Sequence, residues 1–226
     1  MHAIGSGGPR KTDGPPYCYD YPRPAVTVDL AVFALSDDGL RVLLIRREHP
    51  PFEGHWALPG GFLEIDEPIE AGARRELREE TGFDPPGPIA FLGVYGDPER
   101  DPRGRTISLA HAAVIRGAPA DVVGGDDASE AAWRIAQSPG QLAFDHDAML
   151  ARALDWLASG VREGKLGLDL LPEEFDESEI EGMFRSIFGS PDGSSHWLRR
   201  MEKDGLVELR PGSGRVYHAV KAGKSE

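Results

Sequence analysis

One stretch of 23 residues constrains the fold of this chain more than any other: residues 61–83, GFLEIDEPIEAGARRELREETGF. It predicts a helix with Asp66 as the N-cap, Pro68 in the first turn and Gly82 at the C-terminus. Helical side chains advance by about 100° per residue, so apolar residues three to four positions apart share one face. The predicted apolar stripe is Ile69, Ala73 and Leu77. This helix is therefore expected to bury one face against a core.

Three glutamates, Glu76, Glu79 and Glu80, fall on the inward side of this helix, whereas Arg74 and Arg78 are predicted to face solvent. Like charges four positions apart destabilise a helix by about 0.2–0.5 kcal/mol per pair, and burial adds to that cost. A hard, oxygen-seeking cation such as Mg²⁺ or Mn²⁺ would compensate. A solvated helix face paired with arginines explains the same spacing, so spacing alone leaves both interpretations open.

The whole stretch resembles the Nudix box, because every defining position of that motif is present. These positions are Gly61, Glu67, Arg75, Glu76, Leu77, Glu79, Glu80, Gly82 and Phe83. The resemblance implies a Nudix fold of the α/β (α+β) class, in which helices sandwich a mixed sheet. It also implies hydrolysis of a nucleoside diphosphate linked to another moiety, with Mg²⁺ on the box glutamates.

The resemblance also implies roles for individual residues. The implied metal ligands are Glu76, Glu79, Glu80 and the main chain at Gly61. Arg75 is expected to orient Glu79 through a charge-assisted hydrogen bond, and Glu67 to stabilise the loop before the helix. Gly60 and Gly61 allow a close approach of the backbone, although an ordinary tight turn also explains two glycines. The implied chemistry is attack of a metal-activated water on phosphorus.

Two predicted strands precede the box. The alternation of residues 24–32 and the run 40–46 predict strands joined by a turn at residues 36–39. Arg46 and Arg47 end the second strand on the approach to the box. Arginine is the preferred bidentate partner of phosphate, so both are candidate substrate contacts, with two solvated side chains as the alternative.

A long charged loop follows the box, between predicted strands at 88–95 and 106–115. The segment 96–115, GDPERDPRGRTISLAHAAVI, resembles the Nudix branch of ADP-ribose pyrophosphatases. Pro98 matches a proline that such proteins tend to carry. The resemblance implies ADP-ribose as the substrate, with AMP and ribose 5-phosphate as the products. Arg103 and Arg105 are further candidate contacts to the substrate.

An acidic loop is predicted at residues 121–130, and a carboxylate there could act as the base that activates water. The candidates are Asp126, Asp127 and Glu130, of which Asp127 and Glu130 are predicted as catalytic; a solvated loop is the alternative. A helix is predicted to follow as far as Val161, with Asp145 as its cap. Two interpretations of His146 are possible: a catalytic residue, or a histidine at the helix start that packs near the core.

The chain is predicted to have two domains. Residues 1–22 read as a flexible tail, 23–160 as the Nudix domain, 161–167 as a glycine-containing linker and 168–222 as a small winged-helix-like domain. The last segment resembles the C-terminal winged helix of Nudix-related transcriptional regulators. That resemblance implies an alternative function, an ADP-ribose-sensing transcriptional regulator of NAD metabolism that binds DNA through this domain.

The predicted winged helix carries a mixed signal for DNA. From residue 168 onward it has eight Lys and Arg against twelve Asp and Glu, a net charge of −4, whereas groove-binding domains usually concentrate positive charge. One predicted helix nevertheless has a basic face of His196, Arg199, Arg200 and Lys203, and Arg210 and Arg215 flank the wing. Trp197, Leu198 and Met201 are expected to pack inward. Packing on the Nudix domain, or a dimer contact, is the alternative.

Composition limits the partners and the compartment. The net charge of −13 argues against nonspecific binding to nucleic acid or to anionic membranes. Cys18 is the only cysteine, which excludes an intramolecular disulfide and favours a reducing, cytoplasmic compartment. No membrane span is predicted. A homodimer is expected from the family. Because the box is intact, the primary interpretation is a Mg²⁺- or Mn²⁺-dependent hydrolase acting on a nucleotide such as ADP-ribose.

Overall fold

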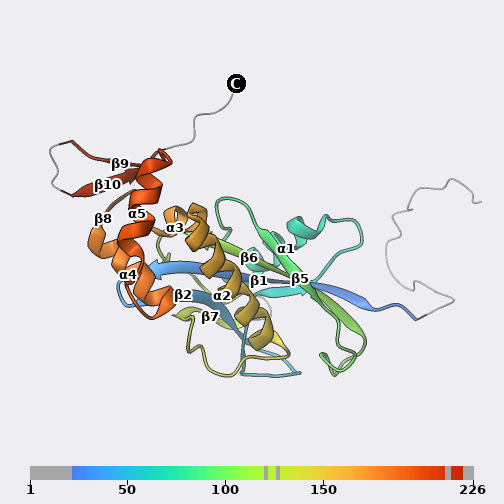
Figure 1. Ribbon diagram of the computed structural model, residues 1–226. Coiled ribbons are helices and arrows are strands. Elements are labelled where there is room, and N and C mark those ends of the chain that lie inside the picture. Colours follow the sequence, from blue (N-terminus) through green and yellow to red (C-terminus); the bar gives the residue numbers. More distant parts are fainter. Residues whose placement is uncertain (1–21, 120–121, 126–127, 212–214, 221–226) are drawn as a thin grey trace, which may run out of the picture.

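The computed structural model describes residues 22–119, 122–125, 128–211 and 215–220 (Figure 1). The strands are β1 (Ala25–Ser36), β2 (Gly39–Arg47), β3 (Trp56–Ala57), β4 (Gly60–Phe62), β5 (Ala90–Tyr95), β6 (Thr106–Ile115), β7 (Ala128–Ile135), β8 (Glu174–Asp176), β9 (Val207–Leu209) and β10 (Val216–Ala219). The helices are α1 (Ile69–Thr81), α2 (His146–Glu163), α3 (Lys165–Leu170), α4 (Glu177–Phe188) and α5 (Ser194–Lys203). Residues 1–21 of the predicted tail lie outside the described residues.

A mixed sheet of seven strands forms the centre of the molecule. Its main path is β3-β2-β1-β6-β5, with β4 also paired to β1 and β7 to β2. β1 runs parallel to β6 and antiparallel to β2 and β4. Because β1 exchanges hydrogen bonds with three strands, it fixes the position of the short strand β4 that begins the box. The predicted mixed sheet is confirmed.

Helices cover both faces of this sheet. On one face, alternate residues of β1 such as Leu30 and Val32 pack with Leu77 of α1. On the other face, Ala31 and Phe33 pack with a row of apolar residues on α2. This row consists of Met149, Leu150, Ala153, Leu157 and Val161. The alternation of side chains along β1 therefore confirms the predicted helix–sheet–helix sandwich.

The start of α1 differs from the prediction. The N-cap position is Pro68, which makes no side-chain cap, and Asp66 lies before it. Ile69, in the first turn of the helix, is 44% exposed and so is not part of the predicted buried stripe, whereas Ala73 and Leu77 are buried as predicted. Arg74 is also less exposed than predicted, since it donates to the Pro85 carbonyl oxygen at 2.8 Å. The end of the helix at Gly82, in the left-handed region with φ of 68°, is confirmed.

The predicted linker at residues 161–167 is helical. α2 continues to Glu163, and α3 begins after Gly164. A single apolar cluster extends from the sheet through α2 into the C-terminal helices, where it includes Met183 and Trp197. The glycines that suggested a linker instead allow close packing, since a Cβ atom on Gly160 would lie 2.3 Å from Leu166. The two parts of the chain are therefore packed on each other rather than joined by a free segment.

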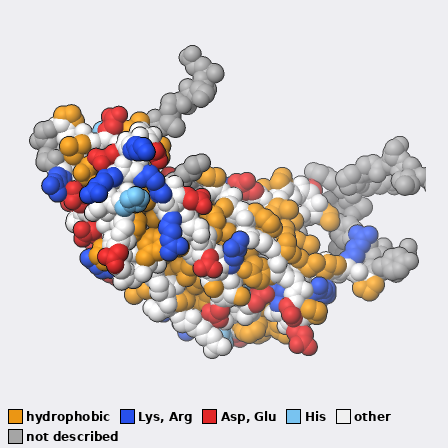
Figure 2. Space-filling view, in the orientation of Figure 1, with side chains coloured by type: hydrophobic (Ala, Val, Ile, Leu, Met, Phe, Trp, Pro, Cys, Tyr) orange, Lys and Arg blue, Asp and Glu red, His pale blue; other side chains and the backbone are white. Residues whose placement is uncertain are grey.

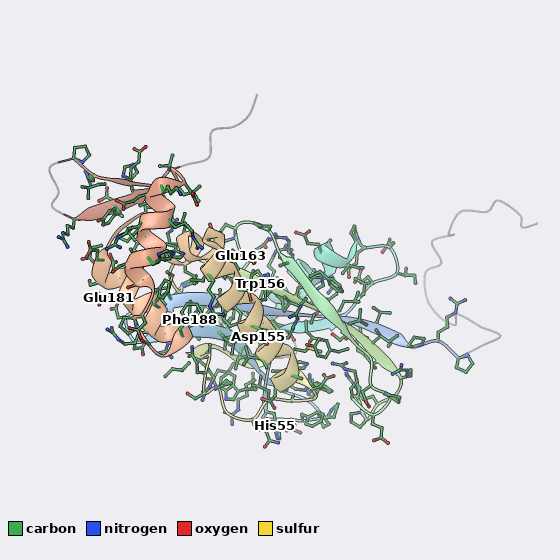
Figure 3. The ribbon with its side chains drawn as sticks, in the orientation of Figure 1. His55, Asp155, Trp156, Glu163, Glu181 and Phe188 are labelled. Atoms are coloured by element: carbon green, nitrogen blue, oxygen red, sulfur yellow. The ribbon has the colours of Figure 1, made fainter. Side chains whose placement is uncertain are left out.

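The C-terminal part has the element order of a winged helix: α3, β8, α4, α5, β9 and β10. β10 pairs antiparallel with both β8 and β9. At the start of α4, Asp176 and Glu179 form a reciprocal capping box. In Figure 3, Phe188 at the end of α4 lies toward α2, where the Arg162 guanidinium carbon is 4.7 Å from its ring centroid. No helix in the described ranges combines the length and apolar character needed to cross a membrane.

Candidate active site

Gly60 and Gly61 begin β4, which pairs with residues 27–29 in the N-terminal half of β1. A Cβ atom on Gly60 would lie 2.2 Å from the Val28 carbonyl oxygen and 2.6 Å from an Asp29 carboxylate oxygen. A Cβ atom on Gly61 would lie 2.5 Å from the Glu76 carboxylate. Glycine is therefore required at both positions for space, since the backbone passes directly against β1 and against a box glutamate.

The three box glutamates of α1 differ in burial. Glu80 is 5% exposed, and the Gly60 N–H donates to its Oε2 atom at 2.8 Å. The side chain of Glu76 is 14% exposed, and that of Glu79 is 45% exposed. Burial raises the pKa of Glu76, and it raises the pKa of Glu80 well above its usual range, with the charges of Glu76 and Asp29 adding to the effect. Ionising these carboxylates together is costly unless a cation is near.

Arg75 is the cation at the centre of the box. Its guanidinium donates to both carboxylate oxygens of Glu67, at 2.7 and 3.0 Å. Its Nη1 atom donates to Glu76 and to Glu79, each at 2.9 Å, and its Nη2 atom donates to the Phe62 carbonyl oxygen at 3.0 Å. The hydrogen bond from Arg75 lowers the pKa of Glu67. The predicted contact of Arg75 with Glu79 is present, and Glu67 is tied to the helix as expected.

The donor chemistry of the box fits a hard divalent cation. The side chains that face one another are carboxylates, and a single arginine is shared among Glu67, Glu76 and Glu79. Among the residues that the structure describes, no group of three or more His, Cys, Asp or Glu side chains is arranged to hold a metal ion. Glu76 and Glu79 point to Arg75, and Glu80 points to the Gly60 N–H. Shared ligation by Glu76, Glu79, Glu80 and Gly61 stays a prediction.

A cavity of about 220 Å³ lies beside the box. It is lined by two box glutamates, both β4 glycines, three arginines, two phenylalanines and buried residues of β1 and α2. The lining residues include Asp29, Arg47, Leu58, Gly60, Gly61, Phe62, Glu76, Glu80, Arg100, Asp101, Arg103, Phe144 and His146. Acidic and basic groups thus face the same space, which suits a ligand that is anionic and bound together with a cation.

The arginines of the cavity are held in place by carboxylates and aromatic rings. Arg100, whose side chain is 3% exposed, makes a bidentate pair with Asp145 at 2.7 and 2.9 Å. This pair explains why Asp145 makes no cap for α2 with its side chain. Arg103 pairs with Asp101 at 2.8 Å, and its guanidinium carbon lies 5.2 Å from the ring centroid of Phe62. Pre-oriented guanidinium groups of this kind suit recognition of phosphate.

Other residues predicted for the site lie elsewhere. Arg46 does not line the cavity, and its Nη1 atom is 3.8 Å from Glu130 across the β2–β7 pair. Glu130 belongs to strand β7, where an acidic loop was predicted. Arg105 donates to the Gly96 carbonyl oxygen and does not line the cavity either. Asp127 lies outside the described residues. Of the four predicted substrate arginines, the structure therefore brings only Arg47 and Arg103 to the cavity.

The described part of the acidic segment, residues 122–125, contacts the end of α1. The Gly125 N–H donates to the Glu80 carbonyl oxygen at 3.1 Å, and the Val123 N–H donates to the Thr81 carbonyl oxygen at 3.3 Å. A Cβ atom on Gly125 would lie 2.1 Å from the Glu79 carbonyl oxygen. The described part of this acidic segment is therefore bonded to the C-terminal end of α1, and Asp126, like Asp127, lies outside the described residues.

Sequence reasoning missed several members of the cavity, above all Asp29. Asp29 is 6% exposed in the middle of β1, and the Ser108 hydroxyl donates to it. A signal was available, since a lone carboxylate inside the apolar run VTVDLAVF is costly unless it is bonded. Arg100 and Asp145 gave no comparable signal, because their pairing joins residues 45 positions apart.

Comparison with known proteins identifies the family. The NUDIX domain matches residues 26–157, which is more than half of this chain. The chain therefore belongs to the NUDIX domain family, and its mixed sheet, sandwiching helices and intact box are those of a Nudix fold.

The similar proteins include both enzymes and regulators. The chain is 35% identical over 192 residues to the ADPR responsive transcriptional repressor NtrR of Acinetobacter baylyi, covering 84% of this chain and 76% of that protein. It is 40% identical over 136 residues to the ADP-ribose pyrophosphatase of Methanocaldococcus jannaschii, covering 60% and 76%. Its structure resembles that of Shewanella oneidensis NrtR complexed with a 27mer DNA, with a TM-score of 0.69 and 27% identity, over 87% and 93% of the two chains.

Proposed function

We propose that this chain is a pyrophosphohydrolase, dependent on Mg²⁺ or Mn²⁺, that cleaves ADP-ribose to AMP and ribose 5-phosphate. The observation that carries the proposal is the meeting of Glu76 and Glu80 with Arg47 and Arg103 around one cavity. Buried carboxylates with raised pKa values call for a cation, and the arginines suit the pyrophosphate. The similarity to an ADP-ribose pyrophosphatase supports this choice of substrate.

The box residues would share the work. Glu76, Glu79 and Glu80 would hold the cation, and the main chain at Gly61 is the proposed fourth ligand. The bound ion would neutralise the pyrophosphate and lower the pKa of a water molecule. Arg75 keeps Glu76 and Glu79 oriented through its Nη1 atom.

Substrate contacts and proton transfer fall to residues outside the box. Arg47 and Arg103 would orient the phosphates, since both line the cavity. Asp127 is the proposed base, because the described Gly125 that precedes it is bonded to the end of the metal-binding helix. Glu130 is the weaker candidate, because it lies in β7 beside Arg46 and does not line the cavity. A cytoplasmic homodimer stays the expectation for the active form.

A substrate panel tests the proposed function. Phosphate release, coupled to a phosphatase that acts only on the products, gives kcat/KM for ADP-ribose, 8-oxo-dGTP and diadenosine polyphosphates. ADP-ribose is expected to have the highest value. A nucleoside triphosphate that is hydrolysed more efficiently than ADP-ribose would contradict the assignment of the substrate.

A second candidate function is regulation of transcription, and one observation favours it. α5 exposes His196, Arg199 and Lys203 and buries Trp197 together with Leu198 and Met201. Figure 2 shows Lys and Arg side chains with a histidine over α5, next to acidic side chains. The similarity to DNA-bound NrtR and to an ADPR responsive repressor supports DNA binding by this helix.

The predicted basic face of the C-terminal part is smaller than the sequence suggested. Arg200 turns toward α2 and donates to the Arg162 carbonyl oxygen. Arg210 pairs with Glu174 and Arg215 with Glu177, so both flanking arginines face carboxylates.

A shift assay on the chain's own upstream DNA, titrated with salt, tests DNA binding. Arg199→Ala is expected to weaken binding and to reduce its salt dependence, while hydrolysis of ADP-ribose is unchanged. No specific binding by the wild type at low salt would reduce the C-terminal part to a packing element.

A further inference from the structure

His146, the first residue of α2, lies 3% exposed in the wall of the cavity. Its Nδ1 atom accepts a hydrogen bond from the Leu58 N–H at 3.0 Å. Its Nε2 atom lies 3.4 Å from Asp29 Oδ1. A ring nitrogen that accepts from an amide carries no proton, so the neutral ring has its proton on Nε2, the nitrogen that is in electrostatic contact with Asp29. Burial lowers the pKa of His146, which favours this neutral form.

Asp29 is held from a second side. The Ser108 hydroxyl, fully buried on β6, donates to Asp29 Oδ2. Asp29 also stands opposite Gly60 in the β1–β4 register. The carboxylate therefore anchors His146 to two strands at the centre of the sheet, and the orientation of the ring is fixed at both of its nitrogens.

The backbone that His146 holds is the segment from Leu58 to Gly61. The Leu30 N–H donates to the Pro59 carbonyl oxygen at 2.9 Å, and the Gly60 N–H donates to Glu80 Oε2 at 2.8 Å. Gly61 follows directly, against the Glu76 carboxylate. Two glycines without side chains cannot fix their own position by packing. The hydrogen bonds at Leu58 and Pro59, together with the β1–β4 pairing, therefore position the Gly60 N–H that meets Glu80.

We propose that His146 is a positioning residue for the metal-binding carboxylates: it fixes the Leu58–Gly61 segment, and through the Gly60 N–H it fixes Glu80. The ligand served by this arrangement is a divalent cation. In this proposal His146 acts through the backbone and is not itself a metal ligand. The inference rests on the proposed function, because it assigns Glu80 to the metal.

Two substitutions separate the hydrogen bond at Nδ1 from the electrostatic contact at Nε2. The amide oxygen of asparagine lies near the place of Nδ1, so His146→Asn keeps an acceptor for the Leu58 N–H. The longer side chain of glutamine reaches the place of Nε2, so His146→Gln keeps a donor for Asp29 and leaves the Leu58 N–H unmatched. His146→Leu removes both contacts. His55→Asn is the control, because His55 is exposed on the loop before β3 and does not line the cavity (Figure 3).

Binding of Mn²⁺ alone, measured by electron paramagnetic resonance, is the first readout. His146→Leu and His146→Gln are expected to bind Mn²⁺ about 10–100-fold more weakly than the wild type, the usual cost of losing a residue that orients a ligand. His146→Asn and His55→Asn are expected to stay within about threefold of the wild type, a small part of that cost. Equal Mn²⁺ affinity in all four folded variants would overturn the proposal, as would equal losses in His146→Asn and His146→Gln. If His146→Leu does not fold, the comparison of His146→Asn with His146→Gln still decides.

Amide hydrogen exchange without metal or substrate is the second readout, and it does not depend on the proposed function. The amides of Leu58 and Gly60 are expected to exchange faster in His146→Gln than in His146→Asn, while amides in β10 are unchanged. Equal exchange in the two variants would refute the positioning role. If the wild type neither binds Mn²⁺ nor hydrolyses ADP-ribose, the proposed function fails, and the exchange result alone judges His146.

Discussion

Arg75 is the residue on which the box geometry depends most. Its guanidinium makes five hydrogen bonds, to three glutamates and one carbonyl oxygen, and its side chain is 22% exposed. A lysine ammonium has three donors and no planar fork, so Arg75→Lys leaves at least one carboxylate without its partner. We expect the free energy of unfolding to fall by about 1–3 kcal/mol, measured by urea denaturation, together with a lower kcat.

Arg78 provides the matched control for Arg75. It lies on the same helix, its side chain is 54% exposed, and it pairs with Asp84 at 3.2 Å. Exposed ion pairs contribute about 0–1 kcal/mol, so Arg78→Lys should change neither stability nor hydrolysis appreciably. Equal effects of Arg75→Lys and Arg78→Lys on stability and on hydrolysis would show that Arg75 contributes no more than an exposed arginine.

His146 predicts a dependence of stability on pH. Burial lowers its pKa below the value of about 6.5 in an unfolded chain. Between the two values the unfolded chain binds more protons, so the stability contributed by neutral His146 is complete above pH of about 6.5 and is lost as the pH falls through the folded pKa. The charged groups around the ring are Asp29, Asp145, Arg47 and Arg100.

Urea melts of the metal-free protein from about pH 8 to pH 5 isolate this effect. The curve of the wild type is expected to fall more steeply below about pH 6.5 than that of His146→Asn, which cannot gain a proton at this position. The difference between the two curves removes the contribution of every other titrating group. Parallel curves would mean that His146 does not titrate between the folded and unfolded states.

At this scale, the sequence predicted the residues that a fixed local spacing connects. Arg75 and Glu79 are one helical turn apart, and their contact follows from the helix alone. It could not predict that Arg100 would pair with Asp145, or that His146 would reach Leu58 across 88 positions, because only the tertiary fold brings those residues together. For Arg46 and Arg47, in contrast, the sequence held information that separates the two residues. Adjacent strand residues point to opposite faces, so at most one of them could face the cavity.

Among the elements, β4 is the short strand that joins the sheet to the box. Gly60→Ala would place a methyl group 2.2 Å from the backbone oxygen of Val28, which β1 holds in place. We expect a loss of about 1–3 kcal/mol in the free energy of unfolding. Gly61→Ala would instead press on the side chain of Glu76, which can rotate away, so stability should fall less and hydrolysis should fall strongly.

Gly182, inside α4, is the control for these two glycines. A Cβ atom there would meet no heavy atom within 4 Å. Gly182→Ala should therefore stabilise the protein by about 0.5–1 kcal/mol, because alanine favours a helix, and it should leave hydrolysis unchanged. Thermal melts and kcat measured on all three variants check the order. A Gly61→Ala variant with full activity would contradict the close contact between β4 and Glu76.

Element boundaries were predicted well where a helix cap signals them, as at Gly82. The linker was wrong for a physical reason. Three glycines, Gly160, Gly164 and Gly167, gave this segment the composition of a flexible linker. Each of them lies against a side chain of the C-terminal part. Glycine used for close helix packing and glycine used for flexibility look alike in a sequence, and only the packing partners distinguish them.

For the whole molecule, α2 connects the cavity to the C-terminal part. Its first residue, His146, lies in the wall of the cavity, and the Val161 carbonyl oxygen near its end accepts from Trp197 Nε1 at 2.9 Å. Because one apolar cluster includes the sheet, α2 and α5, we expect a single cooperative unfolding transition in calorimetry. Trp197→Phe should lower the free energy of unfolding by about 1–3 kcal/mol, since the buried carbonyl oxygen loses its partner. Two separate transitions in the wild type would contradict the shared core.

Hydrolysis of ADP-ribose by the wild type and by Glu80→Gln, at saturating Mg²⁺, tests the central claim most directly. The substitution keeps the volume of the side chain and removes the charge of a carboxylate that is 5% exposed, so the fold should persist, as judged by circular dichroism. The wild type is predicted to release AMP and ribose 5-phosphate, which chromatography resolves. The rate of the Glu80→Gln variant is predicted to be lower by a factor of about 100 or more. A wild type that binds ADP-ribose without cleaving it, or a Glu80→Gln variant with full activity, would contradict the account.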